Sequence, residues 1–318
     1  MGDSYIAADD IADRVQHFDK WFAAMATSPR RDEIVQRNLG LPAAVLSSSL
    51  LPWDGIAEVV ELLRLGVPAT LVDLACGRGG YGLEVAARTG ASLIGVDFSA
   101  EAIRQAGQCA DALGRDARFV VADIAATGLP AASVDGVMCI DAIHIVAEAS
   151  AVFDEVRRIL RPGGRAVVTN WEARDRDSDA LPEWVLQVDC AGWFAAAGFT
   201  DVAVVERPGW EQRERALWAE AAILDPAGDD AVAALRDEAI EELPHVPLTR
   251  RVLASATAPS RGPIDAPERR PNDAASVVPG RAGGRSTRAG LRRSVRRRQL
   301  PDPYETAAPP GRRIQTLR

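Results

Sequence analysis

From about residue 70, short runs rich in β-branched and apolar residues alternate with stretches of helical periodicity, and this alternation constrains the fold most. The patterns predict strands at 71–75, 92–96, 118–122, 136–140 and 165–169, with helices at 81–88, 100–113 and 149–160. Strands that alternate with helices pair in parallel through right-handed crossovers. We therefore expect an α/β, doubly wound, Rossmann-like sheet.

The segments on either side of this core have a different pattern. Residues 1–65 show helical spacing interrupted by prolines, which predicts a helical N-terminal cap. The main domain is expected over residues 66–258. Within it, helices at 211–224 and 229–242 belong to a predicted lid insertion, residues 206–250. Strands at 202–205 and 252–256 are expected to pair as an antiparallel edge, which makes the sheet seven-stranded.

Charge divides the chain into two regions. Residues 259–318 hold 14 arginines and five acidic residues, set among Pro, Gly, Ala and Ser, so we expect a disordered tail. Because the whole chain has a formal charge of −8, the first 258 residues are strongly acidic. An acidic body repels phosphate backbones, so nucleic acid is not an expected partner except through the basic tail.

The spacing of the cysteines and the hydropathy of the chain indicate the cellular compartment. The four cysteines are far apart, with no C-x-x-C pair, and no apolar run approaches the roughly 18 residues that a membrane span needs. The sequence therefore predicts a protein of the reducing cytosol with no membrane association. The oligomeric state has no signal in the sequence.

The first candidate ligand site is the run from Leu71 to Gly80. A hydrophobic strand leads directly into a turn with Gly77 and Gly79, and the turn opens a helix whose N-terminus can receive polar ligand atoms. The run also fits A-x-G-x-x-G, with Asp97 about 20 residues further on, as in a dinucleotide fingerprint. A nicotinamide cofactor therefore remains open here, as does a tight strand–helix connection without a ligand.

Acidic residues in and after the strands favour a different ligand. Asp73 lies inside the first strand, where it repels a pyrophosphate but suits an ammonium group. Asp97 ends the second strand, in position to accept hydrogen bonds from both ribose hydroxyls, and Ser99 is the expected N-cap of the next helix. Asp123 ends the third strand, where a carboxylate can hold an adenine amine. Together they indicate a nucleoside that carries an amino group.

Two further motifs, Ser133–His144 and Arg157–Gly164, follow the glycine turn and the acidic strand ends, so that all of these motifs occur in a fixed order along the chain. Over about residues 45–205 the chain resembles the class I S-adenosylmethionine-dependent methyltransferases, in particular the branch that acts on small molecules in bacterial secondary metabolism. The resemblance implies S-adenosylmethionine as cofactor. Alanine replaces the first glycine of the usual G-x-G-x-G, for which we expect a small effect. The implied cofactor-binding residues are Asp73, Ala75, Cys76, Gly77, Arg78, Gly79, Asp97, Phe98, Ser99, Asp123, Ile124 and Asp141.

The acceptor side is expected near the end of the fourth strand. His144 follows Asp141 by three residues and is a candidate general base, although it could equally pack against the cofactor or the next helix. Trp53, Asn170 and Trp171 are candidate pocket residues. The cap and lid are rich in tryptophan, which suits an aromatic or apolar acceptor, although tryptophans also form core.

Asp141 and Asn170 fall where catechol-type methyltransferases place magnesium ligands. Thr169 replaces the additional carboxylate of those enzymes, so we predict no metal. The expected function is methyl transfer to a hydroxyl or amine of a small molecule. Methylation of carbon or RNA, or non-catalytic use of the cofactor by the same fold, remain alternatives. No Asn/Asp-Pro-Pro-aromatic motif or Pro-Cys nucleophile is present, which argues against DNA amino and cytosine C5 methylation.

Overall fold

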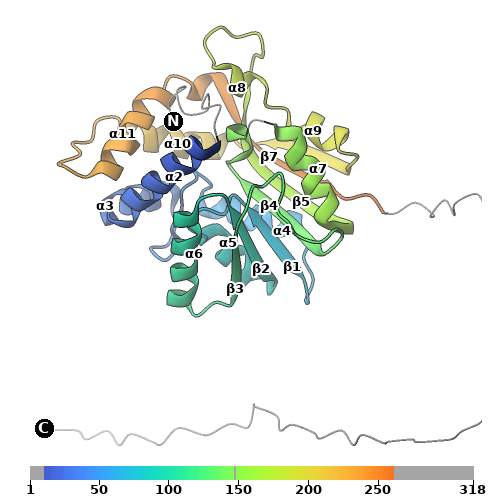
Figure 1. The fold of residues 1–318 in the computed structure, drawn as a ribbon. Helices are drawn as coiled ribbons and strands as arrows, with labels where there is room; N and C mark the ends of the chain where they lie inside the picture. Colours follow the sequence, from blue (N-terminus) through green and yellow to red (C-terminus); the bar gives the residue numbers. More distant parts are fainter. Residues whose placement is uncertain (1–10, 147, 261–318) are drawn as a thin grey trace, which may run out of the picture. The chain divides into compact units, whose positions relative to one another are not determined.

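A computed structural model describes residues 11–146 and 148–260 of the 318-residue chain. Seven strands form one mixed sheet in the order β3-β2-β1-β4-β5-β7-β6 (Figure 1). The predicted α/β fold is confirmed. Nearly all of the predicted tail, residues 261–318, lies outside the described residues. The strands are β1 (Thr70–Leu74), β2 (Ser92–Asp97), β3 (Ala117–Val121), β4 (Val134–Ile140), β5 (Leu160–Ala173), β6 (Thr200–Glu206) and β7 (Thr249–Thr257).

The first five strands pair in parallel, and β7 runs antiparallel to both of its neighbours, β5 and β6. The predicted antiparallel edge is therefore confirmed. β5 is much longer than the predicted 165–169, because β7 pairs with it from Arg165 to Ala173. The length of this pairing brings the start of β7 beside the carboxyl ends of β4 and β5, where the candidate site lies.

Alternate residues of each strand face opposite sides of the sheet, and each side has its own core. Leu71, Met138, Val167 and Leu253 belong to the core on one face, under the helices at residues 53–63, 80–89 and 208–221. Val72, Val137, Val168 and Val252 belong to the core on the other face, under the helices at residues 149–159 and 190–196. Both faces are covered, which explains why the strands are nearly continuous apolar runs.

Three helices that flank the sheet match the predicted helices to within a few residues: α5 (Gly80–Thr89), α6 (Ala100–Leu113) and α7 (Ala149–Ile159). The other helices of this region are α4 (Trp53–Leu63), α8 (Glu183–Leu186) and α9 (Cys190–Ala196). Ser99 is the N-cap of α6, as predicted, and accepts a hydrogen bond from the Ala102 amide.

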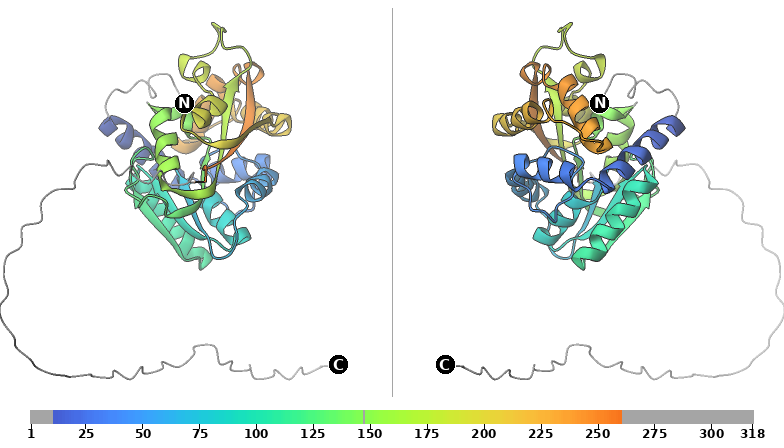
Figure 2. Two further views of the ribbon diagram at one scale, coloured as in Figure 1. Left: turned by 90° about the vertical axis from the view of Figure 1, so that its right-hand side faces the viewer. Right: turned by 90° about the vertical axis from the view of Figure 1, so that its left-hand side faces the viewer.

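The N-terminal helices and the insertion pack on one another. Figure 2 shows α2 (Ile11–Ala26) and α3 (Pro29–Leu39) beside α10 (Pro208–Ala221) and α11 (Asp230–Glu242). Pro29 begins α3, because proline is tolerated in the first helical turn. Its N-cap Ser28 donates from Oγ to Asp229, the N-cap of α11, at 2.6 Å. Cap and insertion thus form a common helical layer. Among the described residues no helix has the length and hydropathy that a bilayer span needs.

Candidate functional site

The glycine-rich turn between β1 and α5 has a left-handed backbone. Gly77 and Gly79 have φ values of +51° and +80°, and Ala75 has +53°. For alanine this conformation costs about 1–2 kcal/mol, so the replacement of a glycine at this position stores local strain. A Cβ at Gly80 would lie 2.3 Å from the carbonyl oxygen of Leu46. The turn therefore lies directly beneath the Leu46–Ser49 segment.

Two buried carboxylates lie beneath this turn. Asp97 accepts hydrogen bonds from the amides of Gly77 and Ser99, both at 2.9 Å, and burial raises its pKa to about 6. Burial, followed by the negative charge of Asp97, raises the pKa of Asp73 well above its usual value. A positively charged ligand beside Asp73 and Asp97 would lower both raised pKa values. The turn therefore fits a cationic ligand better than a pyrophosphate.

Beside the turn is a cavity of about 240 Å³, the Phe98 hollow, which is lined by Ala75, Phe98, Asp123 and Ile124 and closed by α2. From α2, Arg14 donates to the carbonyl oxygen of Ile145, and Asp19 accepts from the Ser99 hydroxyl at 2.5 Å. The predicted adenine-side residues are thus brought together. The lining also includes Arg14 and a second carboxylate, Glu148, and an apolar wall beside carboxylates suits a purine with an exocyclic amine.

A second, much smaller cavity of about 10 Å³, the glycine-turn hollow, is lined by Asp73, Ala75, Cys76 and the Leu46–Ser49 segment. This volume holds no more than about one water molecule. A larger ligand at Asp73 would therefore require the Leu46–Ser49 segment to move away from the turn. Burial raises the pKa of the Cys76 thiol well above its usual value, so it is neutral at physiological pH.

The side chain of Arg78 extends to the cap. Its Nη1 contacts both carboxylate oxygens of Asp32 in α3, at 2.7 and 2.9 Å. Arg31, next in the chain to Asp32, donates to the carbonyl oxygen of Ser47 at 2.7 Å. The turn and the segment above it are therefore both anchored to α3. A contact of Arg78 with the cofactor stays a prediction.

Asp141, at the carboxyl end of β4, is enclosed by protein partners. It has a φ of +53° and accepts from the Thr169 hydroxyl at 2.7 Å and the Leu50 amide at 3.0 Å. Nη2 of Arg251, from β7, lies 2.9 Å from both carboxylate oxygens. The predicted cofactor contact of Asp141 stays a prediction, and these bonds give its carboxylate a structural role.

Arg251 also joins β7 to the insertion. Its guanidinium lies 4.1 Å from the ring centroid of Trp171, and its Nη1 is 3.6 Å from Glu214 of α10. The Trp171 indole donates to both Glu214 oxygens, at 2.8 and 2.9 Å. Trp218 donates to the same carboxylate at 3.3 Å. Burial raises the pKa of Glu214 to about 7, despite the lowering influence of Arg251.

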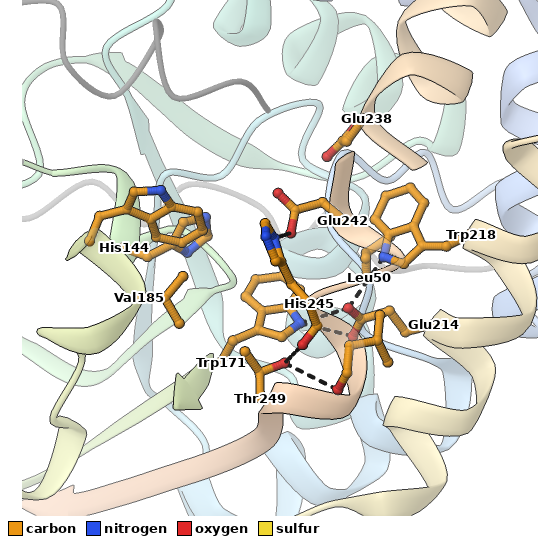
Figure 3. A pocket seen from close by; sticks show the side chains of 12 residues that line it. Leu50, His144, Trp171, Val185, Glu214, Trp218, Glu238, Glu242, His245 and Thr249 are labelled. Atoms are coloured by element: carbon orange, nitrogen blue, oxygen red, sulfur yellow. Dashed lines mark hydrogen bonds and ion pairs between the residues drawn. The ribbon is translucent and has the colours of Figure 1, made fainter. Parts of the chain in front are cut away.

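These groups form one wall of a cavity of about 60 Å³ that we call the tryptophan cavity (Figure 3). It lies beneath the helical layer and is closed by residues of η1 (Ile143–Ile145), β5, α8, α10, α11, η2 (Val246–Leu248) and β7. Its lining residues are Leu50, His144, Trp171, Trp184, Val185, Glu214, Trp218, Glu238, Glu242, His245, Val246 and Thr249.

His144 lies in this wall with the predicted Trp171, whereas the predicted Asn170 is buried and does not line the cavity. Its Nδ1 is 3.1 Å from Oδ1 of Asn170, and its ring lies 5.2 Å from both the Trp171 and Trp184 rings. Burial lowers its pKa to about 4, so the imidazole is neutral at pH 7. A neutral imidazole can accept a proton, but so low a pKa makes it a weak base.

Trp53 lies apart from these residues. The guanidinium of Arg88 in α5 is 4.3 Å from its ring centroid, and Trp53 lines neither the Phe98 hollow nor the tryptophan cavity. The predicted pocket residues are therefore only partly brought together. Trp53 packs on α5 because α4 covers the sheet face rather than the strand ends.

Five residues of this region were not predicted: Glu214, Glu238, Glu242, His245 and Arg251. The four outside β7 lie within the predicted lid insertion, residues 206–250, and have no motif spacing. One feature of the sequence could have indicated Arg251, since it is a charged residue within an apolar strand pattern. Its side chain is 1% exposed, and such residues are rarely buried without a partner.

The described residues contain no group of three or more His, Cys, Asp and Glu side chains suited to a metal ion. Asp141 and Asn170 are both buried, but Arg251 and Thr169 already contact the carboxylate, and Asn170 bonds to His144 and Trp171. The absence of a metal from the reaction stays a prediction.

The comparisons with known proteins agree with this geometry. Residues 72–168 match a family model described as a methyltransferase domain. The chain is 31% identical to a sterol 24-C-methyltransferase of Gibberella zeae over 122 residues, 37% of this chain and 32% of that protein. It is 34% identical to a demethylmenaquinone methyltransferase of Thermus thermophilus over 112 residues, 35% of this chain and 51% of that protein. It thus spans a third to a half of these relatives.

Solved structures share the fold. A phosphoethanolamine N-methyltransferase of Haemonchus contortus aligns with a TM-score of 0.62 at 18% identity, over 79% of this chain and 60% of that one. The cyclase SpnF aligns with a TM-score of 0.58 at 20% identity, over 77% of this chain and 94% of that one. The domain match therefore assigns residues 72–168 to the methyltransferase domain family, and the strand order and the acidic glycine turn fit an S-adenosylmethionine-dependent member of it.

Proposed function

We propose that this protein transfers the methyl group of S-adenosylmethionine to a hydroxyl or amine of a small molecule, in secondary metabolism within the cytoplasm. Asp73 and Asp97 carry the proposal, because two buried carboxylates with raised pKa values need a cationic ligand. S-adenosylmethionine has an ammonium, a sulfonium and a ribose diol. When bound, it supplies an activated methyl group on its sulfonium.

Each group of the cofactor has a candidate partner in this chain. Asp73 would face the amino group and Asp97 the ribose hydroxyls, while Phe98, Asp123 and Ile124 would flank the adenine. Gly77 and Gly79 have no side chain that would block a ligand from the backbone once Ser48 moves away from Gly77, and Ala75 lines both hollows. Residues 66–258 would form the catalytic domain, with residues 1–65 as its cap.

The tryptophan cavity is the proposed acceptor site, with residues 206–250 as its lid. Its residues would orient the acceptor and exclude water, since alignment and desolvation are what the protein contributes to an in-line displacement. His144, held by Asn170, lies in its wall and would take the acceptor's proton. Its low pKa suits an acceptor that loses its proton readily.

Isothermal titration with S-adenosylhomocysteine, with NADH in parallel, tests the cofactor assignment. Micromolar binding of the first alone supports it, whereas binding of NADH alone would replace it with a dehydrogenase. Acceptor-dependent release of S-adenosylhomocysteine from S-adenosylmethionine then tests catalysis. Cofactor binding without turnover across hydroxyl, amine and carbon acceptors would favour non-catalytic use of the cofactor.

A further inference from the structure

The tryptophan cavity has an unusual combination of aromatic rings and negative charge. Its 12 lining residues include three tryptophans, two histidines and three glutamates, and they include no lysine or arginine. Figure 3 shows Glu214 and Trp218 on one side and His144 on the other. Cations bind favourably over aromatic faces, tryptophan most of all, and nearby carboxylates add to this attraction. An anionic ligand would be repelled by the side of the cavity that carries the glutamates.

The nearest cation does not neutralise this charge. Arg251 lies behind Trp171, and its Nη2 is shared between both oxygens of Asp141, so its one positive charge faces Asp141 and Glu214 together. Glu238 and Glu242 lie one helical turn apart on α11. Burial, opposed in part by Arg31, raises the pKa of Glu238, and the neighbouring Glu242 and Glu241 raise it further. The wall therefore has more carboxyl groups than cations to pair with them, and a bound cation would stabilise their ionised forms.

On the basis of the proposed methyl transfer, we propose that the tryptophan cavity binds the nitrogen of an amine acceptor and the cationic head of its N-methylated product. Glu214 and Glu238 are the charge partners, and Trp171, Trp184 and Trp218 form the aromatic walls. This names the acceptor as an amine rather than a phenol or alcohol. A phenolate, carboxylate or phosphate would have to approach three glutamates.

The reaction balances without another reactant. The amine lone pair forms the new N–C bond as the S–CH₃ bond breaks, and the sulfur keeps the electron pair. Positive charge passes from sulfur to nitrogen, where the carboxylates and rings can stabilise it. A primary or secondary amine then loses one proton, for which Glu214 has the better matched pKa, about 7, than His144, about 4. A tertiary amine needs no base.

Size limits which part of the acceptor the cavity can hold. A volume of about 60 Å³ suits a small substituted ammonium head. A second hollow of about 350 Å³ shares His144 and Trp184 with the cavity and includes Trp193. A larger body could extend from the head into this hollow, past the Trp184 ring. Glu148, Ser150 and Gln187 also line the hollow, so the expected acceptor is an amine whose substituent combines a ring or apolar part with polar groups.

Three probes with the same benzyl body test the charge preference. They are benzyltrimethylammonium, the uncharged neopentylbenzene and the anionic phenylmethanesulfonate, each titrated into the full chain saturated with S-adenosylhomocysteine. We expect the cation to bind about tenfold or more tightly than the uncharged probe, with no measurable binding of the anion. Equal affinity for the cation and the uncharged probe, or tighter binding of the anion, would overturn the proposal.

Variants locate the binding to the cavity. Glu214→Gln keeps an oxygen acceptor for the indoles and should weaken cation binding about tenfold without changing the affinity of the uncharged probe. Glu238→Gln should also weaken cation binding, and it tests the proposal even if Glu214→Gln folds poorly. Asp237→Asn, exposed on the same helix as Glu238, is the matched control and should leave all three affinities unchanged. Cation binding unaffected by both glutamate variants would place the site elsewhere and contradict the proposal.

Activity assays distinguish a failure of this inference from a failure of the proposed function. N-methylbenzylamine should be methylated and guaiacol should not. Turnover of guaiacol alone would uphold methyl transfer while overturning the amine assignment. Failure of S-adenosylhomocysteine to bind would instead overturn the proposed function, and the three benzyl probes would still report the charge preference of the cavity.

Discussion

Nη2 of Arg251 lies 2.9 Å from both carboxylate oxygens of Asp141, and both side chains are 1% exposed. The two residues are 110 positions apart in the sequence, and their contact joins the carboxyl end of β4 to β7. Asp141 also accepts from the Leu50 amide, so the same pair holds the segment above the glycine turn. It therefore connects the cofactor side of the site to the acceptor side.

Removal of one member of this pair should strongly destabilise the folded protein. Arg251→Met leaves a buried carboxylate without its cation, so we expect the free energy of unfolding to fall by about 3–5 kcal/mol. Urea denaturation of the full chain measures it. Arg236→Met removes an arginine of a solvent-exposed pair with Asp237 and should cost less than about 1 kcal/mol. A loss of similar size in the two variants would show that the buried pair has no special role.

Asp97 should control both the strength and the pH dependence of cofactor binding. Asp97→Ala removes charge-assisted hydrogen bonds and should weaken S-adenosylhomocysteine binding more than tenfold by isothermal titration. Because its pKa is about 6, the wild-type affinity should also fall as the pH decreases through 6. Asp116→Ala, exposed near the start of β3, serves as the control. Unchanged affinity in Asp97→Ala would refute the ribose assignment.

Glu214 should make stability depend on pH. Its folded pKa of about 7 is above its ordinary 4.5, so its contribution to stability is present below 4.5 and is lost as the pH rises through 7. The melting temperature of wild type minus that of Glu214→Gln should therefore decrease from pH 5 to pH 8. One proton limits the slope to about 1.4 kcal/mol per pH unit. A difference that is constant over this range would mean that Glu214 titrates normally.

His144 should not be the group that sets the activity profile near neutrality. With a pKa of about 4 it stays neutral from pH 6 to pH 8, and its contribution to stability, present above 6.5, is lost as the pH falls through 4. We expect His144→Gln to change kcat without moving any kcat/KM transition between pH 6 and pH 8. Loss of such a transition in this variant would show that His144 titrates in the working range.

Gly80 should be intolerant of any side chain. A Cβ there would meet the backbone of Leu46 at 2.3 Å, so Gly80→Ala should displace the Leu46–Ser49 segment and weaken S-adenosylhomocysteine binding at least tenfold. Gly107→Ala, in α6 with open space around it, should instead stabilise the fold by about 0.5–1 kcal/mol. Normal binding by Gly80→Ala would show that the segment moves freely.

The sequence by itself determined the sheet and the cofactor side, because both depend on local patterns. Apolar runs, helical periodicity and the glycine turn lie within a few residues of one another, and parallel strands bring their carboxyl ends to one edge. Asp97, Phe98, Ser99 and Asp123 could therefore be placed beside the turn before the structure was known.

Only the tertiary structure decided the acceptor side. Glu214 and Glu238 come from helices of the insertion and His245 from the turn after α11. Their place depends on how α10 and α11 pack on α3 and α2, for which a single sequence has no local signal. Arg251 reaches Asp141 because β7 lies between β5 and β6, a long-range pairing. Trp53 lies apart from the tryptophans that line the cavity for the same reason, since composition indicates an aromatic wall but packing decides which rings form it.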